Sequence, residues 1–303
     1  MSPKVSVVIP AYNYGHYIEG AVDSALQQSY ENIEVIVVDD GSTDDTLQRL
    51  ERYQGEPRFQ VVTQLNSGAA SARNRGVESS SGEMIAFLDA DDSYRADNIS
   101  EKVNFLTTYP EYAWCYSDWA WVDEAGVAYK QGSDATVSLA HLKAQGDVFQ
   151  KALQGYRLGT NVFLFRREVI ESVGGFDENL AVLEDYDLYL RAAAGFPLGY
   201  VDKVLCDVFQ HEDSLGTGSS KQLGYYCRWY LNRKLSKLFP DQIAKVNSYW
   251  HDLQADIYRN LAELALSRGF RKRAMVLLCA SFNLKRWQPG IVLLWWRIKR
   301  SVE

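Results

Sequence analysis

The sequence contains few cysteines, and no two of them lie close together. Cys115, Cys206, Cys227 and Cys279 show no C-x-x-C spacing, so we expect neither a zinc site nor a disulfide framework, and a reduced, cytoplasmic setting. No apolar run reaches the roughly 18 residues that span a bilayer, and we expect no signal peptide, because the apolar run after Lys4 is short. Repeats and low-complexity segments are also missing, so the 303 residues predict one large or two modest globular domains.

Two periodicities alternate along the first third of the chain. Short apolar runs at 5–9, 33–38 and 60–62 are typical of strands, whereas residues 17–28 and the stretch ending at Leu50 have the apolar spacing of helices. Strands that alternate with helices predict a mainly parallel sheet with helices on its faces, an α/β fold. Such sheets bind ligands beyond the carboxyl ends of their strands.

Carboxylates follow two of the apolar runs. An acidic pair at 39–40 comes after the run at 33–38, and three acids within 89–92 end the run at 84–88. Crowded carboxylates repel one another, a cost that a divalent cation or a row of sugar hydroxyls among them would offset. A single cluster is more typical of a polar loop than of a ligand site, but two clusters at one edge of the sheet favour a ligand site.

Two other segments, one before the first cluster and one between the two clusters, narrow the choice of ligand. Residues 10–15 occupy the place where a dinucleotide-binding unit has G-x-G-x-x-G, which disfavours that class of site. The small residues of 66–76 predict the start of a helix that carries Arg73 and Arg75. A fixed guanidinium can neutralise phosphate oxygens. Tight packing of the helix on the sheet, with surface arginines, explains the same pattern.

Two later patterns each allow two interpretations. The aromatic residues of 112–122 predict a strand whose rings form core or a platform for sugars. Residues 159–165 predict a further strand.

Helical spacing from Leu183 places Glu184 and Asp185 in the first turn of a helix. The helix dipole favours acids there, and a carboxylate at such a position also suits a general base.

Six motifs in a fixed order resemble those of family 2 glycosyltransferases, which have a GT-A (Rossmann-like) fold. The resemblance covers about residues 4–215. The motifs are PAYN at 10–13, VVDDGSTDDT at 37–46, SARNRG at 71–76, IAFLDADD at 85–92, GGFDE at 174–178 and LEDYDLYLR at 183–191. Any one of them is a weak signal, but the ordered set is specific.

The resemblance implies a binding site for a nucleotide-sugar donor, namely a UDP-, GDP- or dTDP-sugar. Asp40 matches the acid that binds the nucleotide base, in a pocket lined by Pro10 and Tyr12. Asp89 would face the ribose or the water shell of a metal ion. Arg73 is the candidate for the phosphates.

The resemblance also implies a metal ion and a catalytic base. Asp91 would coordinate Mn²⁺ or Mg²⁺ on the diphosphate, and His211 is similar to a late histidine near the diphosphate or the metal. Asp185 matches the expected catalytic base, while Asp92 is left with a capping role. A base on one side and a metal-stabilised leaving group on the other require a single, inverting displacement.

The implied activity is transfer of a hexosyl or related sugar to a hydroxyl of a glycan or lipid-linked acceptor, in bacterial-type surface glycan or glycolipid synthesis. The Q-x-x-R-W signature of processive synthases is missing, which favours transfer of one or a few sugars. A non-catalytic nucleotide-sugar-binding subunit of a glycan assembly complex is the alternative. A sugar nucleotidyltransferase would need a Gly-rich basic loop after the first strand, which the sequence lacks.

The predicted organisation is a GT-A domain at 1–215 and a helical, basic region at 216–303. Within the first, about 1–110 would bind the donor and 111–215 the acceptor. Residues 265–303 carry a net charge of +8, against −15 for the preceding chain, and such a tail usually has its own partner. The Trp-containing basic segment 289–300 suits the surface of an anionic membrane, which would make the protein peripheral on its cytoplasmic face. A helical cap with a solvated basic face is the other interpretation. No nucleic-acid-binding motif accompanies the charge.

Overall fold

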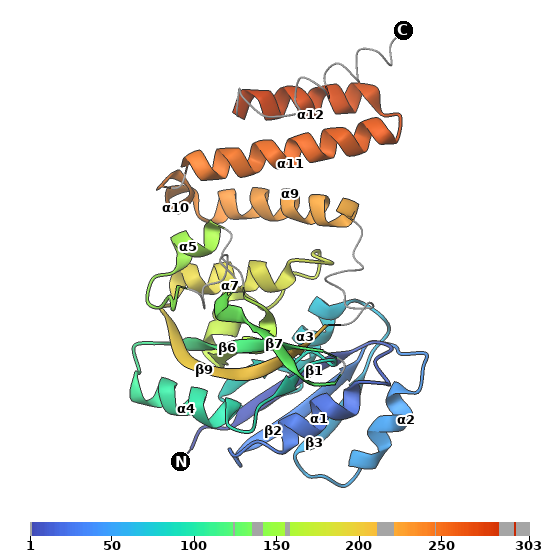
Figure 1. Cartoon of the computed structure of the whole chain (residues 1–303), viewed down its shortest axis with the longest axis vertical. Coiled ribbons are helices and arrows are strands. Elements are labelled where there is room, and N and C mark those ends of the chain that lie inside the picture. Colours follow the sequence, from blue (N-terminus) through green and yellow to red (C-terminus); the bar gives the residue numbers. More distant parts are fainter. Residues whose placement is uncertain are drawn as a thin grey trace. The chain divides into compact units, whose positions relative to one another are not determined.

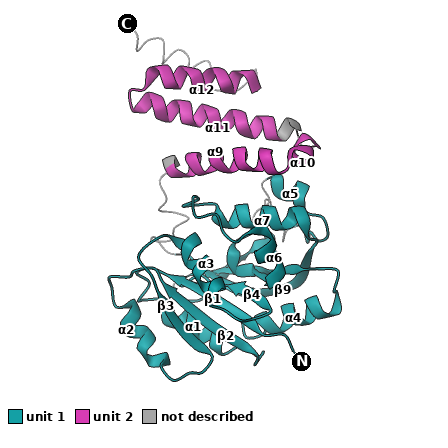
Figure 2. Ribbon diagram, turned by 180° about the vertical axis from the view of Figure 1, so that it is seen from behind, with its two compact units in different colours: residues 1–214 teal, residues 215–303 magenta. Residues whose placement is uncertain are grey.

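The computed structural model describes residues 2–123, 125–134, 142–154, 158–210, 221–245, 247–284 and 294. The chain divides into two compact units, Met1–Ser214 and Leu215–Glu303 (Figure 2). His211 lies outside the described residues, as does segment 289–300 apart from Leu294.

The first unit is built on one sheet of nine described strands. The strands are β1 (Val5–Ala11), β2 (Ile33–Asp39), β3 (Phe59–Thr63), β4 (Met84–Phe87), β5 (Ser93–Tyr94), β6 (Trp114–Val122), β7 (Ala128–Gln131), β8 (Phe163–Arg166) and β9 (Leu198–Phe209). Their order is β3-β2-β1-β4-β8-β6-β9-β5, with β7 paired to β6. The strands from β3 to β4 are parallel, and β8 enters antiparallel between β4 and β6. The predicted α/β fold with a mainly parallel sheet is confirmed.

Helices of the first unit follow the apolar spacing of the sequence. They are α1 (Ile18–Leu26), α2 (Thr46–Leu50), α3 (Ala69–Glu78), α4 (Asn98–Thr108), α5 (Phe149–Leu153), α6 (Arg167–Val173) and α7 (Glu184–Gly195), with short 3-10 turns η1 (Glu51–Tyr53), η2 (Gly132–Asp134) and η3 (Thr160–Val162). In Figure 1, the blue N-terminal part shows β1, β2 and β3 together with α1 and α2. The strand predicted at 159–165 begins only at Phe163, because η3 precedes it.

The central strands of the sheet have continuous apolar sequences because both of their faces are covered. Val5, Val7, Val8 and Ile9 of β1 are all fully buried, as expected of a central parallel strand. The aromatic strand β6 follows the same rule over most of its length, since Trp114 is fully buried and stacks on Phe165 at 5.2 Å between ring centroids. The core interpretation therefore holds for this part of the aromatic segment.

The second unit is helical. It contains α9 (Lys221–Leu238), α10 (Pro240–Lys245), α11 (Asn247–Ser267) and α12 (Arg271–Leu284). α11 and α12 pack through small and aliphatic side chains, among them Ala262, Ala265, Ala274 and Leu278. In the part of the chain that is described, every helix is too short or too polar to cross a bilayer.

Candidate active site

The two acidic clusters lie at the same edge of the sheet. Asp40 follows β2, and its backbone N–H donates a 2.8 Å hydrogen bond to the carbonyl of Ala11 at the end of β1. The loop with Asp89 and Asp91 follows β4, which runs parallel to β1 on its other side. The carboxyl ends of three adjacent strands thus bring both clusters together, as their positions after apolar runs predict.

Tyr14 belongs to this edge, although the sequence alone did not single it out. Burial raises the pKa of its hydroxyl, and the nearby carboxylates of Asp91, Asp89 and Asp92 raise it further. The backbone N–H of Tyr14 donates to Thr46 Oγ1 at 3.0 Å, which fixes the loop after β1. The signal in the sequence was its place directly after the motif at 10–13.

Arg73 of α3 forms ion pairs with two acids from different parts of the chain. Its Nη2 lies 2.7 Å from Asp89 Oδ1 and its Nη1 lies 2.8 Å from Glu184 Oε1. The residue is only 6% exposed, and its Nε has no partner among the described residues. The arginine predicted as a phosphate ligand is therefore enclosed and already paired.

Asp185 lies at the start of α7. Its neighbour in the chain, Glu184, is one of the two acids that pair with Arg73. Burial raises the pKa of Asp185 to about 7, with the negative charge of Glu184 as the second cause. Hydrogen bonding from the backbone N–H of Tyr186 and the positive charge of Arg73 act in the opposite direction. A carboxylate with a pKa near neutrality suits a general base.

The side-chain carboxylate of Asp40 holds the surrounding loop in place through hydrogen bonds. Asp40 Oδ1 accepts hydrogen bonds from Gln64 Nε2 at 2.7 Å and from the backbone of Ser67 at 2.8 Å, and Oδ2 accepts one from the backbone of Gly68 at 2.8 Å. These bonds connect the end of β2 to the start of α3.

Pro10 and Tyr12 flank the end of β1, at the same edge as Asp40. Pro10 pairs with Val38 in the parallel register, and the ring of Tyr12 is 43% exposed. Asn13, next in the chain, has a positive φ of 58°. Its side chain accepts a 2.8 Å hydrogen bond from the backbone of Thr43 and so joins the loops after β1 and β2.

The motif residues around Asn74 act within the fold. Asn74 Oδ1 accepts a hydrogen bond from the backbone of Phe176 at 2.8 Å, and its Nδ2 donates to Glu178 Oε1 at 2.9 Å. Arg191 pairs with the fully buried Asp187 and donates to the carbonyl of Gly175 at 2.8 Å. The motifs at 71–76, 174–178 and 183–191 are thus tied to one another.

The capping role predicted for Asp92 is wrong. Asp92 is buried and accepts hydrogen bonds from the side chain of Asn161 and from the backbone of Phe209, the latter at 2.9 Å. Both partners lie far along the chain, so Asp92 anchors the acidic loop instead of capping the residues that follow it.

The donor groups at this edge suit a hard divalent cation only in part. Carboxylate oxygens are the ligands that Mg²⁺ and Mn²⁺ prefer, and a magnesium ion is commonly held by one or two carboxylates together with substrate phosphates. Over the described ranges, no three His, Cys, Asp or Glu side chains are grouped as metal ligands. Asp91 fits a site completed by phosphate oxygens, whereas Asp89 is engaged by Arg73.

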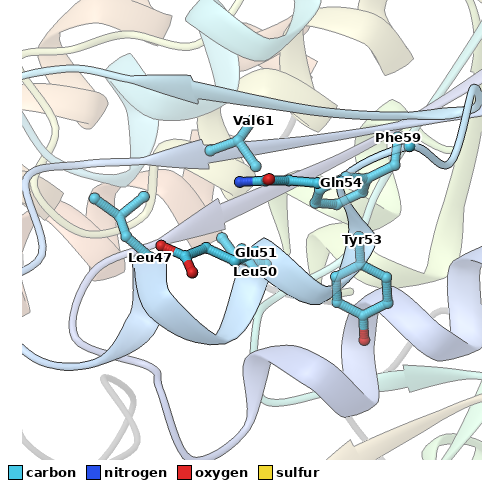
Figure 3. A pocket seen from close by; sticks show the side chains of 8 residues that line it. Leu47, Leu50, Glu51, Tyr53, Gln54, Phe59 and Val61 are labelled. Carbon is cyan, nitrogen blue, oxygen red and sulfur yellow. The ribbon is translucent and has the colours of Figure 1, made fainter.

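A separate cavity of about 370 Å³ lies between α2, η1 and the edge strand β3 (Figure 3). It is lined by Leu47, Leu50, Glu51, Tyr53, Gln54, Gly55, Phe59 and Val61. None of the candidate site residues belongs to this lining, so the cavity is distinct from the acidic edge.

The comparisons with known proteins agree with the motifs. The family model described as "Glycosyl transferase family 2" matches residues 6–174. The chain belongs to glycosyltransferase family 2, and the predicted family is confirmed.

Two curated relatives match over about two thirds of this chain. An uncharacterized glycosyltransferase of Rickettsia bellii is 31% identical over 205 residues, which cover 68% of this chain and 28% of the relative. A chondroitin synthase of Escherichia coli is 30% identical over 213 residues, which cover 70% of this chain and 30% of the relative. The chain thus spans less than a third of the length of these two relatives.

Solved structures match over nearly the whole chain. S. aureus TarS 1–349 in complex with UDP-GlcNAc gives a TM-score of 0.65 at 18% identity, covering 93% of this chain and 89% of that one. The mannosyltransferase PcManGT of Pyrobaculum calidifontis, in complex with GDP-Man and Mn²⁺, gives 0.59 at 20% identity, covering 100% and 81%. At these identities the likeness shows the fold, and the predicted GT-A fold is confirmed.

Proposed function

We propose that the protein is an inverting, metal-dependent glycosyltransferase that moves a hexosyl or related sugar from a nucleotide-sugar donor to an acceptor hydroxyl. The observation that carries this proposal is Asp185, whose pKa is raised to about 7 at the edge where Asp89 and Asp91 lie. A base that is half ionised near neutral pH combines a useful fraction of carboxylate with a useful affinity for a proton.

The donor is proposed to lie across the ends of β1 and β2. Asp40 would accept a hydrogen bond from the nucleotide base, and Pro10 and the exposed ring of Tyr12 would flank that base. Asp89 would face the ribose. The solved relatives bind UDP-GlcNAc and GDP-Man, which supports a UDP-, GDP- or dTDP-sugar as donor here.

Asp91 is the proposed metal ligand, and His211 is a second candidate. When bound, Mn²⁺ or Mg²⁺ would supply positive charge that stabilises the departing diphosphate. The complex of PcManGT contains Mn²⁺, which supports this choice of ion.

Asp185 would accept the proton of the acceptor hydroxyl at Oδ1 or Oδ2 while the oxygen attacks the anomeric carbon. A single displacement of this kind inverts the anomeric configuration, and no second nucleophilic carboxylate is needed.

The proposed acceptor is a glycan or a lipid-linked glycan, in bacterial-type surface glycan or glycolipid synthesis at the cytoplasmic face of a membrane. The chondroitin synthase relative supports a polysaccharide setting. We further propose that the basic C-terminal region meets anionic lipid there. Flotation of the full chain with anionic vesicles, but not with neutral ones, is the expected result.

The decisive experiment compares Asp185→Asn with Glu171→Gln, a control at an exposed position of α6. We expect Asp185→Asn to lose at least about 100-fold in transfer rate, as for loss of a general base, while UDP-GlcNAc or GDP-mannose with Mn²⁺ still raises its melting temperature. Full activity of Asp185→Asn would refute the assignment of the base. Donor binding by the wild type without transfer to any acceptor would favour the alternative, a non-catalytic nucleotide-sugar-binding subunit.

A further inference from the structure

Arg73 connects two acids that are far apart in the sequence. Its two terminal nitrogens lie 2.7 Å from Asp89 and 2.8 Å from Glu184, which is 111 residues away from Arg73. The guanidinium also lies 5.4 Å from the ring centre of Phe176. Because the residue is 6% exposed, little of the guanidinium is open to a ligand.

The two acids that pair with Arg73 belong to different parts of the proposed active site, one to the donor side and one to the side of the base. Asp89 belongs to the donor side, and Glu184 is the direct neighbour of the base Asp185. The charged groups that act on Asp185 are Glu184 beside it, Arg73 from α3, and Asp89 from the loop after β4. The negative charges of the two acids favour protonation of Asp185, and the positive charge of Arg73 opposes it.

We infer that Arg73 is a positioning residue that holds Asp89 and Glu184 at a fixed separation and thereby keeps the base Asp185 in place, and that it is not a ligand of the donor phosphates. The inference rests on the proposed function of Asp185. A donor phosphate would have to reach a guanidinium that is 6% exposed and is already held by two carboxylates, one of them the largely buried side chain of Glu184.

Arg75 provides a matched control on the same helix. Its side chain is 53% exposed, and it forms a 3.5 Å ion pair with the exposed Glu78. Arg75→Ala therefore removes the same charge two residues away without touching the acids of the site.

The test measures the pH profile of kcat for wild type, Arg73→Ala and Arg75→Ala, with UDP-GlcNAc or GDP-mannose as donor. Without the positive charge of Arg73, Asp185 holds its proton more tightly, so we expect the acidic limb to move up by about one pH unit. Part of the activity that Arg73→Ala loses at pH 7 should return at pH 9. Arg75→Ala should follow the wild-type profile.

A phosphate ligand would give a different result. Arg73→Ala would then bind the donor at least about tenfold more weakly, as measured by titration calorimetry, and its acidic limb would stay at the wild-type pH. That outcome overturns the inference, and so does an unmoved limb with unchanged donor binding.

Glu184→Gln keeps the inference testable if Arg73→Ala does not fold. Removal of the neighbouring negative charge should move the acidic limb toward lower pH, opposite to the shift for Arg73→Ala. An upward or absent shift contradicts the inference. Transfer by the wild type decides the proposed function separately, so the failure of one idea can be told from the failure of the other.

Discussion

The backbone N–H of Phe209 donates a 2.9 Å hydrogen bond to Asp92, 117 residues earlier in the chain. This bond ties the end of β9 to the acidic loop after β4. Asn161 donates to the other carboxylate oxygen of Asp92. Burial raises the pKa of Asp92 well above its ordinary value, and Asp89 and Asp91 raise it further. One acid of the cluster thus serves the fold.

Replacing Asn161 with Ala should destabilise the first unit. The change leaves a buried carboxylate oxygen of Asp92 without its side-chain donor, which costs about 1–3 kcal/mol. Urea denaturation followed by circular dichroism measures the loss. Asn104→Ala, at an exposed position of α4, should change stability by less than about 0.5 kcal/mol. Equal effects of the two variants would contradict the role of Asn161.

The sequence predicted the elements and the edge of the sheet, because both depend on local patterns. Apolar runs identify strands such as β1 and β4, and a parallel sheet places their carboxyl ends together. Asp40, Asp89 and Asp91 could be assigned to one site for this reason. The helix start at Glu184 followed from apolar spacing alone.

The pairing of these residues was not predictable from the same patterns. Arg73 looked like a surface or phosphate-binding arginine, because nothing local indicates its partner Glu184, 111 residues away. The three hydrogen bonds that Asp40 accepts from residues 64–68 also depend on how the loops meet. Tyr14 escaped notice because only the folded loop brings its hydroxyl near the carboxylates.

Glu34 should stabilise the fold most strongly above pH 4.5. Burial would raise its pKa, but hydrogen bonds from Lys4, Ser6 and Ser81 outweigh this and lower the pKa to about 2. Because the folded-state pKa lies below the ordinary 4.5, the stabilisation is complete above pH 4.5 and is lost as the pH falls toward 2. Glu34→Gln should cost about 1–2 kcal/mol at pH 6, allowing for solvent screening.

Urea titrations at pH 6 and pH 3 test this dependence. The gap between wild type and Glu34→Gln should narrow at pH 3, where part of the wild-type stabilisation is gone. Glu31→Gln, at an exposed position before the same strand, should show little effect at either pH. A gap that is the same at both pH values would rule out ionised Glu34 as the source of the stability.

The buried charge of Lys102 should lower the free energy of unfolding at neutral pH. Lys102 is fully buried, its ammonium donates a 2.9 Å hydrogen bond to Asn98 Oδ1, and burial lowers its pKa to about 8. Because the folded-state pKa lies below the ordinary 10.5, the penalty is complete below pH 8 and disappears as the pH rises toward 10.5. Lys102→Met should therefore be more stable by about 1–3 kcal/mol at pH 7.

Thermal unfolding of Lys102→Met and wild type between pH 7 and pH 10 measures this difference. The advantage of the variant should shrink as the pH rises. Lys151→Met, at an exposed position of α5, should match wild type throughout. A destabilised Lys102→Met would show that the bond to Asn98 outweighs the cost of the buried charge.

Replacing Gly76, where α3 packs on β1, should lower the stability of the fold, whereas replacing Gly20 in α1 should not. A Cβ at Gly76 would lie 2.2 Å from Val8 Cγ1, whereas a Cβ at Gly20 meets no atom within 4 Å. Gly76→Ala should lose about 1–3 kcal/mol by overpacking, and Gly20→Ala should gain about 0.5–1 kcal/mol by lower backbone entropy in the unfolded chain. Urea denaturation of both variants, and of Gly76→Ala combined with Val8→Ala, tests the contact. If Gly76→Ala costs as much in the Val8→Ala background as in the wild type, the close approach of α3 to β1 is not the cause of the loss.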